Sequence, residues 1–374
     1  MSRPTVAEID LAALRYNFNK VRQLSGSGSK TLAIVKANAY GHGAVTIARE
    51  LEKCGADFLG VALCEEAVEL RTAGIRSPIM VMGGVYNSQA EDVVAHRVIP
   101  VLFDIETALS LDAFAARSGL RLKVHIKLDT GMGRIGILPG DIHGFFERLK
   151  ACQFLEVDGL LTHLAVADTI SPPADDFTKA QMHMFLDMSA RVREMGFNPT
   201  YMHLANSAAI LRHLEPCFNL IRPGLMLYGI SPSLEPVTEL RPVMTLKTRI
   251  VALKKVPAGS SISYRRTFIT GRDSIIATLP IGYADGYNRH FSNRAPVLIR
   301  GRRAAIVGVV CMDMVMVDVT DIPDVRPQDE VILLGSQGDE SIDAGELSEI
   351  AHSIPYELLC CIGSRVPRVY IHES

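Results

Sequence analysis

The sequence predicts an α/β protein in which an N-terminal (β/α)8, TIM-like barrel is followed by a C-terminal, mainly β domain. In the first part of the chain, short apolar runs alternate with segments of helical periodicity, the pattern typical of βα units. Beyond a proline-rich connection, β-branched runs separated by turn residues replace this alternation. Because 374 residues are many for one core, we expect two domains, residues 1–238 and 239–374.

Eight apolar runs predict the strands of the barrel, and their number and spacing favour a barrel over a doubly wound sheet. They are Thr31–Lys36, Phe58–Leu63, Pro78–Met82, Val98–Phe103, Leu122–Leu128, Leu155–His163, Thr200–Leu204 and Phe218–Ile221. Segments of helical periodicity lie between them, and glycines follow several of these segments where helices commonly end. The predicted helices include Ala44–Cys54, Glu65–Ala73, Ile105–Arg117, Asp141–Cys152 and Asp176–Met195.

The second domain is expected to be rich in β structure and barrel-like. A connection with prolines at 232, 236 and 242 precedes it. One segment of helical periodicity, Ala344–His352, lies near its end. Its predicted strands lie in the runs Val243–Leu253, Ser274–Leu279, Pro296–Ile299, Ala304–Val310, Val315–Val319 and Glu330–Leu334.

Composition narrows the class of protein. The net charge is −2 and there is no run rich in lysine and arginine, so nothing indicates a nucleic-acid partner. No apolar stretch is long enough to span a bilayer, and the first residues lack the apolar segment of a signal peptide. The seven cysteines form no C-x-x-C pair, so neither a disulfide framework nor a metal site is expected. We therefore expect a cytoplasmic enzyme with reduced thiols, with Cys360 and Cys361 packed in the core.

Lys36 is the first candidate catalytic residue. It ends a predicted strand, and a polar turn containing Tyr40 and two glycines follows at once. Partial burial there favours the neutral, nucleophilic amine that Schiff-base formation with an aldehyde cofactor requires. A single lysine at a strand end more often extends to water. Polar residues at the ends of the other predicted strands favour the functional interpretation, because barrel enzymes place their chemistry at that end.

Two of these strand ends are typical of phosphate binding. Arg222-Pro223-Gly224 follows the eighth predicted strand, where barrels commonly bind phosphate, and Gly224 allows an anion to approach the backbone. Asn206-Ser207 follows the seventh, so that Ser207 begins a short helix and offers its hydroxyl and amide. A simple turn and an ordinary helix cap are the structural alternatives.

The fifth and sixth strand ends carry further candidates. Arg134, in a glycine-containing loop after Lys127, presents a rigid fork suited to a carboxylate. The alternative is a surface loop in which Arg134 pairs with Asp129. His163 ends the sixth predicted strand, and this position favours a role in the site over that of a histidine at the edge of the core.

Two segments of the second domain complete the set of candidates. Tyr264 precedes two arginines, and neighbouring positive charge lowers the pKa of a phenol toward the range of acid–base catalysis. Taken alone, an interface tyrosine with an exposed hydroxyl is the better interpretation. Met312-Asp313 lies between two β runs, where a bulge can direct an amide toward a ligand; the alternative is a methionine-rich core hairpin.

Together these motifs resemble the pyridoxal-phosphate-dependent alanine racemases, a family with fold type III, over essentially the whole chain. The order of the motifs makes the resemblance specific, although Arg265 stands where a glycine is usual. The motifs are Val35–Gly43, Lys127–Arg134, His203–Ser207, Arg222–Gly229, Ser263-Tyr264, Gly282–Gly286 and Cys311–Asp313.

The resemblance implies a homodimer with an active site shared between subunits and pyridoxal 5′-phosphate as the cofactor. Lys36 would form the Schiff base with it, Arg222 would face its pyridine nitrogen, and Tyr40, Ser207, Gly224, Leu225 and Tyr356 would hold its phosphate. Arg134 and Met312 of the partner subunit would bind the substrate carboxylate. The residues implied at the cofactor are Lys36, Tyr40, His163, His203, Asn206, Ser207, Arg222, Gly224, Leu225 and Tyr356. Those implied in supporting roles are Lys127, which relatives can carry as a carbamate, Tyr283 at the substrate entrance, and Asp313.

The implied reaction interconverts L-alanine and D-alanine and supplies D-alanine for peptidoglycan. Racemisation needs a base on one face of the α-carbon and an acid on the other. Tyr264 would take the proton from L-alanine and Lys36 from D-alanine, with His163 and Arg222 lowering the pKa of Tyr264 through a hydrogen-bond network. An arginine beside the pyridine nitrogen leaves that nitrogen unprotonated, which disfavours a long-lived carbanion.

Three alternatives remain open at this point. A fold-type III decarboxylase of diamino acids shares the barrel and the β domain, but it favours an acidic group where this chain has Arg222. A non-catalytic pyridoxal-phosphate carrier consists of the barrel alone, so the second domain with Tyr264 and Met312 argues against it. A racemase of broader specificity, acting on serine or larger amino acids, is only weakly excluded, because pocket size depends on geometry.

Overall fold

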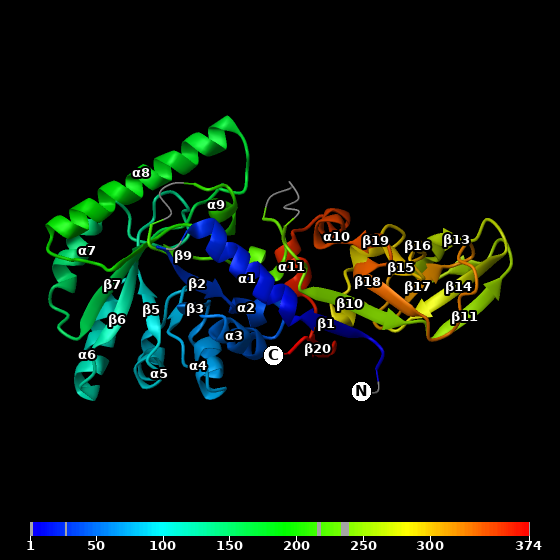
Figure 1. The fold of residues 1–374 in the computed structure, drawn as a ribbon, viewed down its shortest axis with the longest axis horizontal. Coiled ribbons are helices and arrows are strands. Elements are labelled where there is room, and N and C mark those ends of the chain that lie inside the picture. Colours follow the sequence, from blue (N-terminus) through cyan, green and yellow to red (C-terminus); the bar gives the residue numbers. More distant parts are fainter. Residues whose placement is uncertain (1–2, 27, 215–217, 233–238, 374) are drawn as a thin grey trace.

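The computed structural model describes residues 3–26, 28–214, 218–232 and 239–373. The part of the proline-rich connection at 233–238 lies outside these ranges, as does Cys217. The described chain forms an elongated molecule with a barrel at one end and a β-rich unit at the other (Figure 1). The predicted barrel and the predicted mainly β second unit are therefore confirmed.

The barrel consists of eight parallel strands in the order β9-β2-β3-β4-β5-β6-β7-β8. A parallel bridge between Asn206 and Arg222 joins the two ends of this sheet. Most strand residues are buried, because helices cover one face and side chains fill the interior, and this explains the continuous apolar runs. The strands are β2 (Lys30–Ile34), β3 (Phe58–Val61), β4 (Ile79–Val81), β5 (Ile99–Leu102), β6 (Leu122–Lys127), β7 (Leu155–Leu161), β8 (Tyr201–His203) and β9 (Leu220–Ile221).

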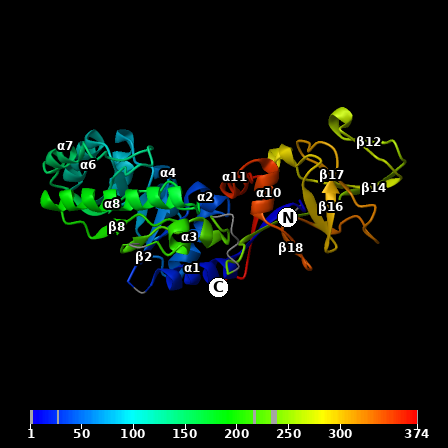
Figure 2. The ribbon, with the colours of Figure 1, turned by 90° about the horizontal axis from the view of Figure 1, so that it is seen from above.

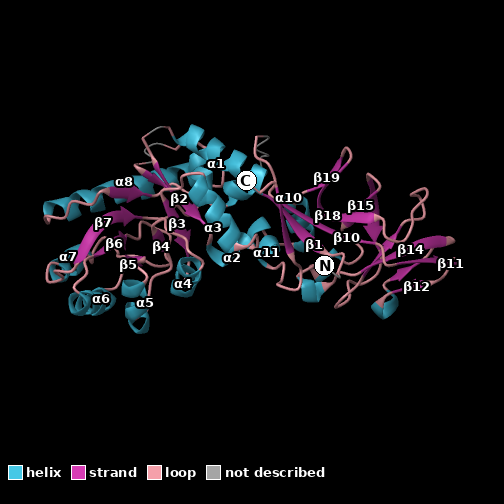
Figure 3. Ribbon diagram, turned by 60° about the horizontal axis from the view of Figure 1, so that its bottom comes forward, coloured by secondary structure: helices cyan, strands magenta, loops and turns pink. Residues whose placement is uncertain are grey.

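Helices surround the barrel on its outside (Figure 3). Their ends follow local rules: the Asp10 and Asp104 side chains cap α1 and α6, and Gly119 ends α6 in the left-handed conformation. The predicted helices are confirmed, although α8 begins four residues earlier than expected, with Pro172 at its first position. The helices are α1 (Leu11–Ser25), α3 (Ala44–Lys53), α4 (Cys64–Thr72), α5 (Ala90–Ala95), α6 (Ile105–Ser118), α7 (Ile142–Leu149), α8 (Pro172–Glu194) and α9 (Ser207–Leu211), with short 3-10 turns η1 (Asn87–Gln89) and η2 (Leu225–Tyr228).

The C-terminal sheet follows the order β11-β14-β17-β16-β15-β18-β10-β1-β20, with β19 paired to β18. Within the described residues, no pairing joins β11 to β20, so the expected closure into a barrel is not formed. The predicted run Val243–Leu253 divides into β10 and part of β11, which pair with different strands. The strands are β10 (Met244–Arg249), β11 (Ala252–Val256), β14 (Ser274–Leu279), β15 (Pro296–Ile299), β16 (Arg302–Ile306), β17 (Val315–Asp318), β18 (Glu330–Gln337), β19 (Glu340–Ile342) and β20 (Arg368–Ile371).

Shorter elements accompany this sheet. The hairpin of β12 (Ser261–Ile262) and β13 (Phe268–Ile269) forms a separate two-stranded sheet. Two helices, α10 (Ala344–Ala351) and α11 (Pro355–Cys360), lie on the side of the sheet that faces the barrel (Figure 2). The 3-10 turns are η3 (Tyr264–Arg266), η4 (Tyr283–Asp285) and η5 (Arg289–Phe291).

The first strand of the chain belongs to the C-terminal sheet. β1 (Val6–Asp10) lies between β10, to which it is antiparallel, and β20, to which it is parallel. The sequence did not predict this strand. It crosses from one unit to the other before α1 begins the barrel (Figure 1).

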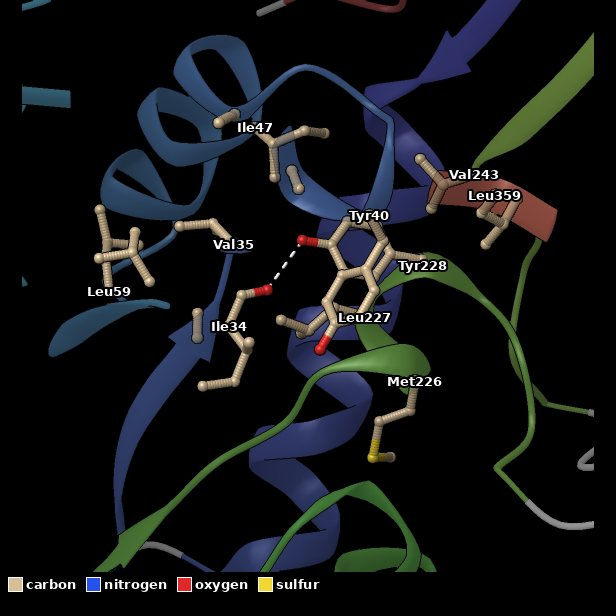
Figure 4. Packing of buried hydrophobic residues seen from close by; sticks show 14 of the residues in the cluster. Ile34, Val35, Tyr40, Ile47, Leu59, Met226, Leu227, Tyr228, Val243 and Leu359 are labelled. Carbon is tan, nitrogen blue, oxygen red and sulfur yellow. Dashed lines mark hydrogen bonds between the residues drawn. The ribbon is translucent and has the colours of Figure 1, made fainter. Parts of the chain in front are cut away.

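The two units share one continuous hydrophobic core. At the junction, Tyr228 donates a hydrogen bond to the carbonyl of Ile34 at 2.8 Å, and its ring packs beside that of Tyr40 (Figure 4). Polar contacts strengthen the same junction: Arg368 Nε donates to the carbonyl of Gly41, and Tyr370 donates to that of His42. The turn that follows Lys36 is therefore fastened by the last strand of the chain.

Within the described ranges, no helix has the length and apolar character needed to cross a membrane.

The expectation that Cys360 and Cys361 pack in the core was wrong, because both are exposed at the end of α11. Apolar neighbours in the sequence do not reveal which face of a short helix is buried.

A buried carboxylate fixes the start of the chain to the C-terminal unit. Asp285 is almost inaccessible to solvent, and Arg3 contacts both of its oxygens at 2.7 and 2.6 Å. Burial alone would raise the pKa of Asp285, but the hydrogen bonds from Arg3 and from the amide of Gly282 outweigh it, and the pKa is lowered. Since the folded-state pKa is lowered, this group stabilises the fold above its ordinary pKa and loses that effect as the pH falls.

Asp285→Asn is expected to lower the free energy of unfolding by about 3 kcal/mol, because it leaves Arg3 without its buried partner. Urea denaturation at pH 7 measures this change. Asp321→Asn is the matched control, because Asp321 also pairs with an arginine, Arg272, but is exposed, and it should leave the midpoint unchanged. Equal effects of the two substitutions would contradict the assigned role of Asp285.

Candidate active site

Lys36 stands at the start of an unusual turn, α2 (Lys36–Tyr40). The residues Ala37 to Tyr40 all have positive φ angles, between 50° and 54°, although none is glycine. A left-handed conformation costs roughly 1–2 kcal/mol per such residue. The Asn38 side chain accepts a hydrogen bond from the amide of Ala44 at 2.8 Å and offsets part of this cost. Backbone strain of this kind is concentrated at functional sites.

Glu66, in the first turn of α4, also holds this turn. Its carboxylate accepts hydrogen bonds from the amide of Ala37 at 2.6 Å and from the amides of Ala62 and Leu63. Sequence analysis did not single out Glu66. Its position three residues after a helix start is the signal of a capping box, but the contact with Ala37 depends on the neighbouring strands β2 and β3.

The Lys36 side chain is partly buried, as expected for a nucleophilic amine. Burial lowers its pKa, and the positive charge of Arg134 lowers it further, while the Glu66 carboxylate opposes this shift. More of the amine is therefore neutral near physiological pH than in an exposed lysine.

Tyr40, Ser207 and Gly224 meet beside Lys36. Ser207 Oγ accepts a hydrogen bond from the amide of Gly224 at 2.9 Å. A Cβ atom at residue 224 would lie 2.9 Å from the Tyr40 hydroxyl, so a side chain there would crowd the tyrosine. Burial raises the pKa of Tyr40, which keeps its hydroxyl protonated as a donor. The hydroxyls of Tyr40 and Ser207, on either side of the backbone at Gly224, form a cradle suited to phosphate.

Other predicted phosphate residues border the same place. Tyr356, on α11, has its ring centroid 5.6 Å from that of Tyr40, and burial raises its pKa to about 12. Asn206 caps α9 by accepting from the amide of Ala209, and Leu225 is buried at the start of η2. A cavity of about 140 Å³ opens here. Its lining includes Met132, His163, Asn206, Ser207 and Tyr356.

Arg222 is buried at the end of β9, with 4% of its surface exposed. Its guanidinium donates to the carbonyls of Thr162 at 2.8 Å and Leu204 at 3.0 Å, and it reaches Nδ1 of His203 and His163 at 3.2 and 3.3 Å. Among the described residues, no carboxylate pairs with it. Burial, helped by the charge of Arg134, lowers its pKa to about 9.

The histidines beside Arg222 are neutral, and their hydrogen bonds fix the tautomers. Because Arg222 donates to Nδ1 of His203, Nε2 of His203 carries the proton and donates to Nδ1 of His125 at 2.8 Å. Burial lowers the pKa of all three rings, to about 4 for His125 and about 2 for His163. A Cβ atom at Gly159 would lie 2.2 Å from the His125 ring, so this glycine makes room for the chain.

His125 had no signal in the sequence beyond its place in a buried strand. Nε2 of His125, the far end of the Arg222–His203–His125 chain, is buried without a hydrogen-bond partner in the described structure. This series of hydrogen bonds runs from Arg222 to the buried ring of His125, and it holds the guanidinium in one orientation.

The loop that carries Arg134 is shaped by Asp129. Asp129 Oδ1 accepts hydrogen bonds from the amides of Gly131, Met132 and Gly133 at 2.9, 2.9 and 3.2 Å. The alternative interpretation, an ion pair between Asp129 and Arg134, is therefore not found. Arg134 is exposed, and its charge lowers the pKa values of Lys36, Lys127 and His163, so it lies close to all three.

Lys127 is buried below this loop, with 5% of its surface exposed. Burial is the largest cause of its low pKa, about 7, and the charges of Arg222 and Arg134 contribute. Together with Lys36, these side chains give the site an excess of positive charge. Such a site favours ligands that carry negative groups.

The site residues predicted in the second domain are exposed, and they do not join the group of residues around Lys36. Tyr264, Met312 and Tyr283 are 67%, 52% and 43% exposed. Hydrogen bonds link their segments: the amides of Tyr283 and Ala284 donate to the carbonyls of Cys311 and Met312, and Ser263 Oγ donates to Val309. The hairpin that carries Tyr264 lies at the far end from the barrel (Figure 2). One chain thus does not bring Tyr264 to Lys36.

Arg265 occupies a backbone conformation that explains the glycine usual at this position. Its φ is 60°, and those of Ser263 and Arg266 are 65° and 50°. Three non-glycine residues in the left-handed region store strain next to Tyr264. Asp313 forms an ion pair with Arg365 at 2.7 Å and so holds the adjacent Met312 segment.

Comparisons with known proteins agree with this architecture. Residues 9–232 match the family model of the alanine racemase N-terminal domain, and residues 243–370 match that of the C-terminal domain. A curated alanine racemase of Halothermothrix orenii is 47% identical over 99% of this chain and 97% of its own. The alanine racemase structure from Bacillus anthracis with bound L-Ala-P is 37% identical, with a TM-score of 0.93 over 100% and 96% of the two chains. That from Bartonella henselae, with covalently bound pyridoxal phosphate, is 30% identical, with a TM-score of 0.87 over 98% and 99%.

The two-domain fold and its relatives define an enzyme of the isomerase class. The similarity extends over both domains and over nearly the full length of the relatives. The chain belongs to the alanine racemase family. This result supports the racemase interpretation over the decarboxylase, because the named relatives are alanine racemases.

The low pKa of Lys127 predicts a distinct pH dependence. After reductive methylation with ¹³C-formaldehyde in buffer free of carbon dioxide, the Lys127 resonance should titrate near pH 7, while that of Lys30, which pairs with Asp57, titrates above its ordinary value. Lys127→Met assigns the signal. Since the unfolded chain holds this proton more tightly, the contribution of Lys127 to the free energy of unfolding should increase from about pH 7 to pH 10.5. A Lys127 midpoint near that of an exposed lysine would contradict the assignment.

Proposed function

We propose that this protein interconverts L-alanine and D-alanine with pyridoxal 5′-phosphate held by the barrel, and that it supplies D-alanine for peptidoglycan in the cytoplasm. The observation that carries the proposal is Lys36, an amine of lowered pKa beside the Tyr40–Ser207–Gly224 cradle. The family to which the chain belongs supports the choice of alanine.

The residues present fit the cofactor. The cradle has the donors and the open space that a phosphate needs, and Arg222 offers a fixed donor for a ring nitrogen. When bound, pyridoxal phosphate supplies an aldehyde that reacts with amines and a conjugated ring that withdraws electrons from the α-carbon of the substrate. In the proposal, residues 1–238 hold the cofactor and residues 239–374 supply the second base.

The two proposed bases act on opposite faces of the substrate α-carbon. Lys36 Nζ removes the α-proton when D-alanine is converted to L-alanine, and it donates a proton to the same face of the α-carbon in the reverse reaction. Its lowered pKa makes both transfers feasible. The hydroxyl of Tyr264 of the partner subunit serves the other face. Arg134, together with the amide of Met312 of the partner subunit, orients the substrate carboxylate, and Tyr283 and Tyr356 narrow the entrance.

The separation of these residues supports the proposed homodimer. Tyr264, Met312 and Tyr283 are exposed on linked segments of the second domain, whereas Lys36, Arg134 and Arg222 gather in the barrel. An exposed set of functional residues suits a surface that completes the site of a second copy. A head-to-tail dimer brings each set to the other.

Lys127 is proposed to carry a carbamate. A neutral amine reacts with carbon dioxide to form a carbamate and release a proton, and a pKa of about 7 leaves much of Lys127 neutral. The product replaces a buried cation by an anion close to Arg134 and Arg222. The modification thereby relieves the repulsion that lowers the pKa of Lys127 and helps to orient Arg134.

Incubation of the purified protein with L-alanine and pyridoxal phosphate in deuterated water tests the main proposal. Optical rotation should decay to zero while deuterium replaces the α-proton. Lys36→Ala should abolish both signals, because it removes the amine that transfers the proton. L-serine in a parallel reaction measures specificity, and a rate equal to that of alanine would favour the broader racemase. Release of carbon dioxide from a diamino acid without deuterated alanine would overturn the proposal.

Mixing two inactive variants tests the shared site. Lys36→Ala and Tyr264→Phe each remove one base, so a mixed dimer contains one site with both bases intact. After subunit exchange, up to about half of the activity per heterodimer should return. Confirmed heterodimers without recovery would place Tyr264 and Lys36 of the same chain in one site.

A further inference from the structure

A second cavity, of about 430 Å³, lies at the opposite end of the barrel strands from Lys36. It is formed where the chain enters β4, β5 and β6, and its lining comes from the three loops that precede these strands, from the first residues of β5 and β6, and from the end of α4. The helices that lead into these loops, α4, α5 and α6, lie next to one another outside the barrel (Figure 3). We call this cavity the lower cleft. Nothing in the proposed reaction uses it.

The lower cleft is lined by cations. Each of the three loops contributes one exposed arginine: Arg76 before β4, Arg97 before β5 and Arg121 before β6. In the described structure, none of these three guanidinium groups has an ion-pair or hydrogen-bond partner. Three guanidinium groups on three neighbouring loops thus line one cavity, and none of them forms an ion pair with a carboxylate in the described structure.

Two further cations border the cleft, and both have partners. Arg71 donates to the carbonyls of Ile75, Ser77 and His96, and so holds two of the loops in place. Lys123 pairs with Asp158 at 3.1 Å. These contacts organise the rim and leave the three free arginines as the groups available to a ligand.

We propose that the lower cleft binds a small molecule with a chain of two or more phosphate groups. Arginine matches phosphate by paired hydrogen bonds, and a chain of phosphates offers each of the three guanidinium groups on separate loops its own pair of oxygens. Pro78 and Leu120 add apolar lining, against which an organic portion can pack. The volume lies within the range of small-molecule sites. Inorganic polyphosphate and nucleoside polyphosphates share this chemistry.

Calorimetric titration of the protein loaded with pyridoxal phosphate tests the proposal, because the cofactor occupies the phosphate cradle of the active site. The probes are tripolyphosphate, ATP, adenosine and inorganic phosphate, without divalent cations. Tripolyphosphate and ATP should bind, and inorganic phosphate should bind at least tenfold more weakly, because it engages fewer arginines. Tighter binding of ATP than of tripolyphosphate identifies a nucleotide as the ligand, and equal binding identifies the phosphate chain alone.

Arg97→Ala/Arg121→Ala should weaken the binding of tripolyphosphate about tenfold or more. Arg302→Ala/Arg326→Ala is the matched control: it removes the same charge from exposed positions in the second domain and should change the affinity less than about twofold. Racemisation by both variants reports that they are folded. Failure of both polyphosphates to bind, or an equal loss in the control, would overturn the proposal without bearing on the racemase assignment.

Discussion

The buried guanidinium of Arg222 is the constraint on which the site depends. A charge that is removed from water needs partners, and here these are backbone carbonyls and neutral imidazole nitrogens instead of a carboxylate. Each partner must therefore present a lone pair, which sets the tautomer of His203 and, through it, that of His125. Because the charge is not neutralised locally, it also lowers the pKa values of Lys127 and His163. Burial, the uncompensated charge of Arg222 and the charge of Arg134 together set the electrostatics of the site.

Strain around the reactive amine has a similar origin in tertiary contacts. The left-handed turn after Lys36 is held from three directions: by Glu66 on α4, by Asn38 within the turn, and by Arg368 on the last strand. The contacts from Glu66 and Arg368 join the turn to segments distant in the sequence, so tertiary contacts from both units hold it in place. The second domain thereby supports the barrel site within the same chain, in addition to the contribution proposed for its exposed residues in a dimer.

The sequence predicted the barrel well because its strands are buried on both faces and read as continuous apolar runs. It did not predict β1, whose five residues alternate between buried and half-buried and whose partners lie more than 230 residues away. In the site, strand-end positions pointed to Lys36, Arg134 and Arg222. The roles of Glu66, Asp129 and His125 could not be foreseen, since each depends on which segments are neighbours in space. The position of Tyr264 far from Lys36 was implied by the family resemblance and not by any pattern of residues.

The insertion of β1 between β10 and β20 has a consequence for the order in which the molecule forms. As the chain is synthesised, residues 6–10 emerge long before residues 368–371, which form one of their two neighbouring strands. Until then, this strand has an unpaired edge, and the C-terminal sheet cannot be completed. The barrel can begin to fold beside it, but this sheet is completed only when residues 368–371 are available to pair. The topology thus links the completion of the fold, and with it the turn at Lys36 fastened by β20, to the late synthesis of residues 368–371.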